Sequence, residues 1–298
     1  MSRATPPQRS EDGSQPYLVL SGQDDEICWL EYLTEGQRVV SGSRDGTVRV
    51  WNLESGEQEG APMEHESSMT DLAVTRDGTK IISGDKEGRM KVWDVESHEL
   101  VKEWSHPAGY PNIALSPDGW LVAVRGGSVA IYTIEGRSHI DPIKIDGVVL
   151  STCFSPDGSK LACGTYEEIH VYDIASGRLI LGPVDASCVR DLLWSRNGSR
   201  LLAGSDDGSI RCWNSDTAQQ IGHPWTGHTR GICCLSLSPN GSVLASASFD
   251  KTICFWNATT GNFVGQHIWH NGPVKTVRFS PSGESVASVG GDRRICFW

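Results

Sequence analysis

Two nearly identical units follow each other at the end of the chain, between Gly227 and Trp298. The second unit repeats a His, a Ser, an Asp and a Trp of the first at one constant interval, the distance from Trp256 to Trp298. The two quartets are His228, Ser246, Asp250 and Trp256, and His270, Ser288, Asp292 and Trp298. Short apolar runs alternate with turns rich in Gly, Asn, Asp and Pro, which predicts short antiparallel strands. A repeat of about 40 residues predicts stacked sheets that bury one another's faces.

The upstream sequence contains five more diverged copies of this unit. A glycine marks the first hairpin turn of every copy, at Gly36, Gly78, Gly119, Gly158, Gly198, Gly241 and Gly283. Glycine suits this turn because it adopts a positive φ that other side chains resist. An aromatic residue then ends the third strand of every copy, at Trp51, Trp93, Tyr132, Tyr172, Trp213, Trp256 and Trp298. The landmarks therefore predict seven units.

This pattern resembles the WD40 repeat, in which each unit supplies the four-stranded blade of a β-propeller. The resemblance implies an all-β, seven-bladed propeller over residues 16–298. Because the chain stops at the Trp of its seventh unit, the last blade lacks an outer strand. The segment Tyr17 to Ser21 is expected to pair with the strand ending at Trp298 and to close the ring. Residues 1–15 lack the apolar core of a secretory signal and are expected to form a disordered tail.

The quartets are interpreted as architecture. A chain of hydrogen bonds from Trp to Ser, from Ser to His and from His to Asp would satisfy four polar groups buried between blades. A Ser-His-Asp catalytic triad is the alternative, but an active site would not recur in several blades. Unit two has the same quartet with Glu87 in the place of Asp, and unit one has Gln23 in the place of His. Their other members are His65, Ser83 and Trp93, and Ser41, Asp45 and Trp51.

Units three and four depart further from the repeat. The interval from the turn glycine to the aromatic is the same in the other five units, as from Gly241 to Trp256. It is two positions shorter from Gly119 to Tyr132 and one shorter from Gly158 to Tyr172. Their second hairpin is therefore expected to be shortened. Two explanations stay open: sequence drift in blades held by their neighbours, or a groove or partner footprint over the altered turns.

Composition narrows the class of partner. The net charge of −11 argues against direct binding of nucleic-acid phosphates. Apolar runs stay well short of the ~18 residues of a membrane span. The nine cysteines include no CxxC pair and are expected to be small buried side chains in a reducing compartment. A monomeric propeller in the cytoplasm or nucleus, in contact with neither nucleic acid nor membrane, is therefore expected.

One end of the propeller is the candidate binding surface. In a four-stranded meander, the loop before the first strand and the turn between the second and third strands share an end. Acidic residues gather there in units one, four and five, and basic residues in units six and seven; solvated turn charges are the alternative interpretation. Propellers similar to this one bind peptides or protein surfaces at that end, which implies a protein or peptide partner in a multiprotein complex. The candidate partner-binding residues are Arg44, Lys86, Glu167, Asp206, Arg230, Phe249, Lys251, Arg293 and Arg294.

Signatures of catalysis are missing from the sequence. It contains no GxSxG, GxxxxGK[ST] or HExxH, and His267 and His270 would point to opposite faces of an extended strand. The inner strands offer chiefly Leu, Val, Ala, Ser and Cys. No metal or cofactor is therefore expected, and the chain is interpreted as a non-enzymatic interaction scaffold. The alternative is a small-molecule or hydrolase-like site in the central channel. Five tryptophans outside the quartets are expected to pack in the core: Trp29, Trp104, Trp120, Trp225 and Trp269.

Overall fold

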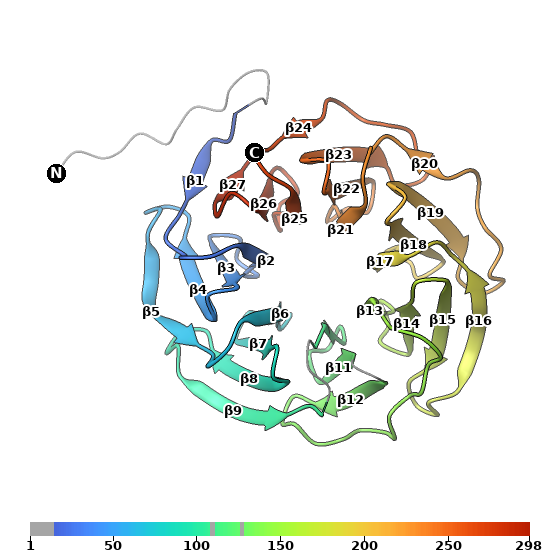
Figure 1. Cartoon of the computed structure of the whole chain (residues 1–298), viewed down its shortest axis with the longest axis horizontal. Coiled ribbons are helices and arrows are strands. Elements are labelled where there is room, and N and C mark those ends of the chain that lie inside the picture. Colours follow the sequence, from blue (N-terminus) through green and yellow to red (C-terminus); the bar gives the residue numbers. More distant parts are fainter. Residues whose placement is uncertain (1–14, 108–110, 126–127) are drawn as a thin grey trace.

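The computed structural model describes residues 15–107, 111–125 and 128–298. These residues form seven antiparallel sheets arranged in a ring around a central channel (Figure 1), and none of them is helical. The predicted seven-bladed, all-β propeller is confirmed. Of the predicted disordered tail, only Gln15 falls within the described residues. No helix of this part of the chain is long and apolar enough to cross a membrane.

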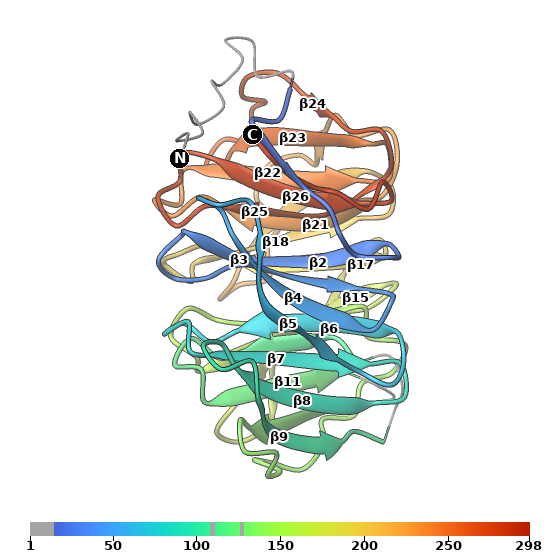
Figure 2. The ribbon, with the colours of Figure 1, turned by 90° about the vertical axis from the view of Figure 1, so that its left-hand side faces the viewer.

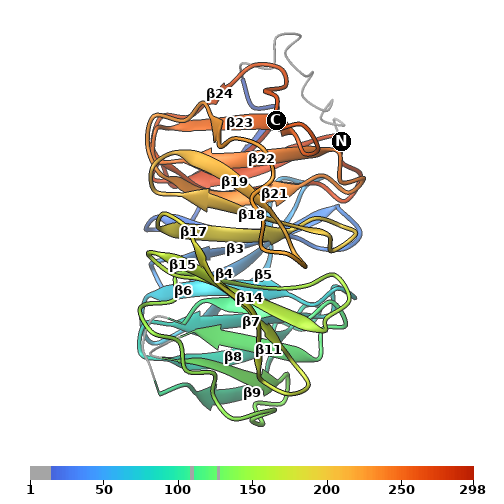
Figure 3. The same cartoon turned by 90° about the vertical axis from the view of Figure 1, so that its right-hand side faces the viewer.

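Blades 1 and 2 each consist of four strands in sequence order, from the channel outward. Blade 1 contains β2 (Ile27–Tyr32), β3 (Arg38–Ser43), β4 (Thr47–Asn52) and β5 (Gln58–Glu64). Blade 2 contains β6 (Met69–Val74), β7 (Lys80–Asp85), β8 (Arg89–Asp94) and β9 (Leu100–Ser105). Edge views in Figures 2 and 3 show a disc in which the strands run from one flat face toward the other.

Blades 3 and 4 are formed by the two shortened units. Blade 3 contains β10 (Ile113–Leu115), β11 (Leu121–Arg125) and β12 (Val129–Thr133), and blade 4 contains β13 (Ser151–Phe154), β14 (Lys160–Gly164), β15 (Glu168–Asp173) and β16 (Leu179–Asp185). Outside β12, the described chain makes only single bridges, from Val129 to Ile143 and from Tyr132 to Ser138. The sheet of blade 3 therefore has three strands. Strands β11 and β14 have five residues where β3 and β22 have six, but β26 of a regular unit also has five, so strand length alone does not mark the shortened units.

Blades 5 and 6 again have four strands each, but their outermost strands contain two residues. Blade 5 contains β17 (Val189–Trp194), β18 (Arg200–Ser205), β19 (Ser209–Asn214) and β20 (Trp225–Thr226). Blade 6 contains β21 (Ile232–Leu237), β22 (Val243–Ser248), β23 (Thr252–Asn257) and β24 (Ile268–Trp269).

Blade 7 takes strands from both ends of the chain. Its inner strands are β25 (Val274–Phe279), β26 (Val286–Gly290) and β27 (Ile295–Phe297), and its outer strand is β1 (Leu18–Leu20). Leu18 pairs with Phe297 and Leu20 with Ile295, and the amide of Tyr17 donates to the carbonyl of Phe297 at 2.8 Å. Figure 1 shows β1 alongside β27. The predicted closure of the ring by the N-terminal strand is confirmed.

The hydrophobic core lies between blades. Seven clusters of buried side chains each draw on two neighbouring blades, so that every junction of the ring has one. At the closing junction, Phe297 and Ile295 of blade 7 pack with Leu30 and Trp51 of blade 1. Burial of apolar surface is the main stabilising term of a fold. Because each blade contributes to two clusters, the stability of the ring is collective.

The first hairpin turns explain the regular glycines. All seven predicted turn glycines have a φ between 71° and 77°. In blade 2 the amide of Gly78 donates to the carbonyl of Thr75 at 2.8 Å, which closes the turn. L side chains rarely adopt this φ, so the position requires glycine.

Candidate functional site

A channel of about 1200 Å³ runs through the centre of the ring. Its walls carry more charge than the sequence pattern suggests. The cations that line it are Arg44, Arg76, Arg190, Arg196, Lys275 and Arg278, and the acids are Glu31, Asp71 and Asp191. The expectation of a wall of chiefly small and aliphatic side chains was therefore incomplete. In a chain of net charge −11, the channel is a place where basic residues outnumber acidic ones.

A bulge near the start of the inner strand sets which side chains reach the channel. The register shifts by one residue at this point in blades 1, 2, 5, 6 and 7. The extra residues lie at one constant interval before the Trp of each unit, and all five line the channel: Cys28, Thr70, Arg190, Cys233 and Lys275. A bulge changes the direction of a side chain relative to regular alternation. It brings Arg190 and Lys275 to the mouth of the channel.

Six side chains form a continuous arc at this mouth, which we call the mouth arc: Asp206, Arg190, Phe249, Lys275, Glu26 and Arg44. Arg190 pairs with Asp206 at 2.6 Å, and its guanidinium lies 5.2 Å from the centre of the Phe249 ring. The ammonium of Lys275 lies 4.9 Å from the same ring. The mouth arc thus holds a half-buried aromatic ring between two cations.

The same arc continues into blade 1. Lys275 is 3.6 Å from the carboxylate of Glu26, which also pairs with Arg44 at 2.9 Å. Blades 5, 6, 7 and 1 each contribute at least one member. Two carboxylates stand against three cations, so the mouth arc has a net positive charge.

The candidate partner-binding residues divide into two groups. Arg44, Phe249 and Asp206 belong to the mouth arc. The other six, Lys86, Glu167, Arg230, Lys251, Arg293 and Arg294, are exposed in turns and do not line the channel. Backbone bonds from Arg44 to Glu26 and from Phe249 to Gly231 show that, within a blade, the two loops meet at one end.

Sequence reasoning did not identify Arg190 and Lys275 as candidates. Both occupy the extra position of the inner-strand bulge, where the other three bulged blades have Cys28, Thr70 and Cys233. Variation at one column of an otherwise regular repeat was the available signal. The acidic and basic residues at the mouth are also paired with one another, as Asp206 with Arg190 shows.

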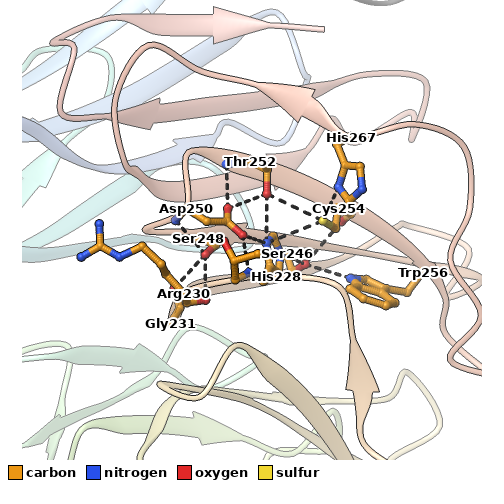
Figure 4. A network of polar contacts seen from close by, with 11 residues as sticks. His228, Arg230, Gly231, Ser246, Ser248, Asp250, Thr252, Cys254, Trp256 and His267 are labelled. Atoms are coloured by element: carbon orange, nitrogen blue, oxygen red, sulfur yellow. Dashed lines mark hydrogen bonds and ion pairs between the residues drawn. The ribbon is translucent and has the colours of Figure 1, made fainter.

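The quartet of blade 6 forms the hydrogen-bond chain expected of it (Figure 4). The indole of Trp256 donates to Ser246 Oγ at 2.8 Å, Ser246 Oγ lies 2.7 Å from His228 Nε2, and His228 Nδ1 lies 2.9 Å from Asp250. Ser246 is fully buried. Burial lowers the pKa of His228 despite the nearby carboxylate, which keeps the ring neutral. The four groups therefore satisfy one another inside the blade.

The other quartets vary in their last link. In blade 7, the Ser288 hydroxyl contacts both Trp298 and His270 at 2.8 Å, but His270 Nδ1 is 4.0 Å from Asp292. In blade 1, Ser41 Oγ donates to Gln23 Oε1 at 2.8 Å, so that Gln replaces His in the chain. Trp51 donates to the same hydroxyl at 2.8 Å.

Blade 2 requires a correction. The sequence placed Glu87 beside His65, but Glu87 is exposed and the buried Asp85 lies 3.6 Å from His65 Nδ1. Asp85 accepts hydrogen bonds from the amides of Glu87 and Arg89, both at 3.0 Å. Two acids lie two residues apart in this hairpin, and the turn directs the first of them inward. The rest of the quartet is present, with Ser83 Oγ 2.7 Å from His65 Nε2 and 2.8 Å from the Trp93 indole.

Charged groups deeper in the channel are held by structural contacts. Arg278 Nε pairs with Glu31 at 2.6 Å, and its Nη1 lies 2.7 Å from Cys234 Sγ. Asp191 accepts a hydrogen bond from the amide of Leu235 in blade 6 at 2.7 Å, and Asp71 does the same for Ile113 in blade 3. Burial raises the pKa of Asp191 to about 6. These residues tie neighbouring blades together.

The five tryptophans that were expected to pack in the core do not share one role. Trp225 is buried between blades 5 and 6, as expected. Trp29 is half-buried and lines the channel, and Trp104 is half-buried against Tyr132. The expectation of core packing is wrong for Trp120 and Trp269, which are 51% and 68% exposed.

These features together define a class of protein, the repeat β-propeller with a buried polar quartet in several blades. The sequence model described as "WD domain, G-beta repeat" matches residues 14–52, 58–94, 180–214, 219–257 and 261–298. The matches cover more than half of the chain, which therefore belongs to the WD40 family. They leave unmatched the stretch that contains the two shortened units.

Two relatives and one solved structure illustrate the similarity. Striatin from Homo sapiens is 26% identical over 75% of this chain and 25% of striatin. Small ribosomal subunit protein RACK1y from Oryza sativa subsp. japonica is 30% identical over 35% of this chain and 34% of that protein. This chain thus matches about a quarter of striatin and a third of the rice protein. The β-propeller domain of Myceliophteria thermophila Cps50 (Swd1) superposes with a TM-score of 0.81 at 16% identity, covering 94% of this chain and 99% of that domain.

Proposed function

We propose that this propeller is a non-enzymatic interaction scaffold that binds a peptide or protein surface on the mouth arc. The observation that carries the proposal is Phe249, a half-buried aromatic ring held between Arg190 and Lys275 at the channel mouth. Aromatic and Arg side chains are enriched among the residues that dominate binding energy. Because their ion pairs and ring contacts already hold them in place, little conformational entropy would be lost on binding.

The chemistry of the mouth arc favours a particular kind of segment. Three cations and two carboxylates leave the arc positive, and the Phe249 ring offers an apolar contact. A partner segment with an apolar or aromatic side chain next to an acidic one would match both features. The exposed basic residues Arg230, Lys251, Arg293 and Arg294 would add long-range attraction for such a partner.

Two further expectations accompany this proposal. The partner belongs to a multiprotein complex in the cytoplasm or nucleus; one relative is itself named as a ribosomal subunit protein, which is compatible with that role. The propeller acts as a monomer and contacts neither nucleic acid nor membrane directly. The alternative, a small-molecule or hydrolase-like site in the channel, is less favoured because Glu31, Arg278 and Asp191 already hold one another or the backbone.

The test compares the two ends of the channel. The tagged protein is used to isolate partners from its native extract, and the affinity of a stoichiometric partner is then measured with purified components. Arg190→Glu, Phe249→Ala and Lys275→Glu alter the mouth arc, and Arg76→Glu with Arg196→Glu reverses charge at the other end of the same channel. We expect Phe249→Ala alone to weaken binding by about 2 kcal/mol, or roughly 30-fold. A partner lost in the Arg76 and Arg196 variant but retained by the mouth-arc variants would refute the proposal.

A further inference from the structure

The quartet of blade 7 contains three side chains of the types that bind transition metals. His270 Nδ1, a carboxylate oxygen of Asp292 and Cys296 Sγ all lie within 4.8 Å of one another. The side chain of His270 is 1% exposed, that of Asp292 is 14% exposed, and Cys296 is buried. Imidazole nitrogen, carboxylate oxygen and thiolate sulfur are the usual protein ligands of Zn²⁺.

These three groups are not bonded to one another. His270 Nδ1 is 4.0 Å from Asp292, beyond hydrogen-bonding distance, and among the described residues it has no other hydrogen-bond partner. The Cys296 thiol likewise has none in this part of the chain. His270 Nδ1 therefore lies close to a carboxylate and a thiol without a direct hydrogen bond to either, an arrangement that leaves room for an ion bound by all three groups.

Blade 6 provides an internal comparison because it has the same residues at the same spacing. There, His228 Nδ1 is 2.9 Å from Asp250 and 3.0 Å from the hydroxyl of Thr252 (Figure 4). Cys254 Sγ lies 2.9 Å from His267 Nδ1. The polar groups of blade 6 are therefore satisfied by protein contacts alone.

Two sequence differences explain why blade 7 stays open. Arg294 stands where blade 6 has Thr252, so no hydroxyl reaches His270 Nδ1. Val19 of β1 pairs with Cys296, so no imidazole faces that thiol. The thiol itself is confined to blades 6 and 7 among the blades that end in Trp. Blades 1, 2 and 5 have a cation two residues before the Trp, at Arg49, Lys91 and Arg211. A cation there would repel a metal ion.

We propose that blade 7 binds one Zn²⁺-class divalent cation through His270 Nδ1, Asp292 and Cys296, with water as the fourth ligand. The sequence excluded only the neighbouring pair His267 and His270. The ligands that complete the set come instead from the turn between β26 and β27 and from β27 itself. Bond lengths of about 2.0 to 2.3 Å would place the donor atoms roughly 3.5 Å apart, which requires small inward shifts from their present separation. The Asp292 carboxylate is partly exposed, so water can reach the site.

The hydrogen bonds around His270 are suited to metal binding. Metal at Nδ1 requires the proton of His270 on Nε2, where Ser288 Oγ lies at 2.8 Å to accept it. Ser288 also accepts the Trp298 indole proton at 2.8 Å, and its own proton can go to the carbonyl of Cys296 at 3.4 Å. One hydroxyl provides two acceptor sites and one donor, so all three bonds can be made. Such contacts orient a metal-binding imidazole.

Charge balance also favours the ion. A divalent cation bound by one thiolate, one carboxylate and one neutral imidazole is neutral overall, which suits a buried position. Cysteine binds a metal ion as the thiolate, and an ordinary thiol is largely protonated at neutral pH. Binding at neutral pH therefore releases one proton to solvent for each ion bound.

The test uses Co²⁺ as a spectroscopic substitute for Zn²⁺ in chelator-treated full-length protein. We expect one equivalent of Co²⁺ to give a thiolate-to-metal charge-transfer band that Zn²⁺ abolishes by displacement. Cys296→Ser should remove the band and weaken Zn²⁺ binding by at least about tenfold. Cys254→Ser, the same position of blade 6, should leave both unchanged.

A second measurement tests the proposal on the wild-type protein, in case a variant folds poorly. Calorimetric titration of the wild-type protein with Zn²⁺ in buffers of different ionisation enthalpy should show release of one proton per ion. Zn²⁺ should also raise the unfolding temperature of the wild-type and Cys254→Ser proteins, but not of Cys296→Ser. The proposal is overturned if wild-type protein gives no charge-transfer band, or if the band persists in Cys296→Ser or is lost in Cys254→Ser.

Discussion

The hydroxyl of Ser246 links two buried rings, the indole of Trp256 and the imidazole of His228. It accepts the Trp256 indole proton and bonds to His228 Nε2. Ser246→Ala leaves a donor on Trp256 and a nitrogen on His228 without partners in a buried space. We expect a loss of roughly 1 to 3 kcal/mol in the free energy of unfolding, measured by urea denaturation.

The matched control is Ser187→Ala, an exposed serine in the loop before β17. Substitutions at such positions change stability by less than about 0.5 kcal/mol. If the two variants were equally stable, the quartet of blade 6 would contribute little to the fold, and its recurrence would need another explanation.

At the scale of single residues, spacing identified the quartets but not every member. Counting from the Trp finds His, Ser and Asp in blades 6 and 7 because those hairpins have the repeat's regular length. In blade 2 the same count reaches Glu87, whereas the buried acid is Asp85. Side-chain direction within a tight turn depends on its hydrogen bonds, and Asp85 accepts two amide protons of its own turn. Spacing does not contain that information.

The strand β1 is short, yet it completes the ring. Leu20 is 3% exposed and packs into the cluster shared by blades 7 and 1, whereas the neighbouring Val19 is 42% exposed. We expect Leu20→Ala to lower the free energy of unfolding by roughly 2 to 5 kcal/mol, because it leaves a cavity at the closing junction. Val19→Ala, in the same strand, should cost much less. Urea denaturation of the two variants measures the difference, and equal losses would mean that β1 does not close the core.

At the scale of whole strands, sequence predicted this closure because an apolar run stood without a unit of its own. The outer strands were harder to predict from the sequence. Trp269 belongs to a two-residue strand at the rim of blade 6, where only one face meets protein. Aromatic content alone does not distinguish an exposed rim from a buried one. The sequence of unit three indicated a shortened hairpin but not a three-stranded sheet. Whether the chain outside β12 pairs as a strand or only by single bridges depends on tertiary contacts.

For the whole molecule, the ring was predictable and the chemistry of its channel was not. The period of the repeat sets the number of blades, and each blade needs neighbours on both sides. The channel wall depends instead on the bulge at the start of the inner strand, which interrupts alternation of side chains. Arg190 and Lys275 reach the mouth because of that extra residue. A period-two pattern cannot indicate where the bulge falls.

The buried histidines make the stability of the whole ring sensitive to acid. Burial lowers the pKa of His65 from its ordinary 6.5 to about 4, and also lowers the pKa of His106, His228 and His270. Each neutral ring contributes stability that is complete above pH 6.5 and is lost as the pH falls toward the folded pKa. Asp191 acts in the opposite direction, since a raised pKa stabilises the fold at low pH and this contribution is lost as the pH rises through about 6.

Acidification removes the stabilising contribution of four histidines and adds that of one aspartate, so the histidines decide the direction of the pH dependence. We expect the free energy of unfolding to fall between about pH 7 and pH 5, with His65 alone contributing roughly 2 kcal/mol. His65→Gln isolates that contribution, because Gln23 occupies the same position of blade 1 and bonds to its serine there. The variant should keep the bond to Ser83 but lose that part of the pH dependence in urea denaturation at the two pH values. An unchanged pH dependence would show that the pKa of His65 is the same in the folded and unfolded protein, and would refute the prediction.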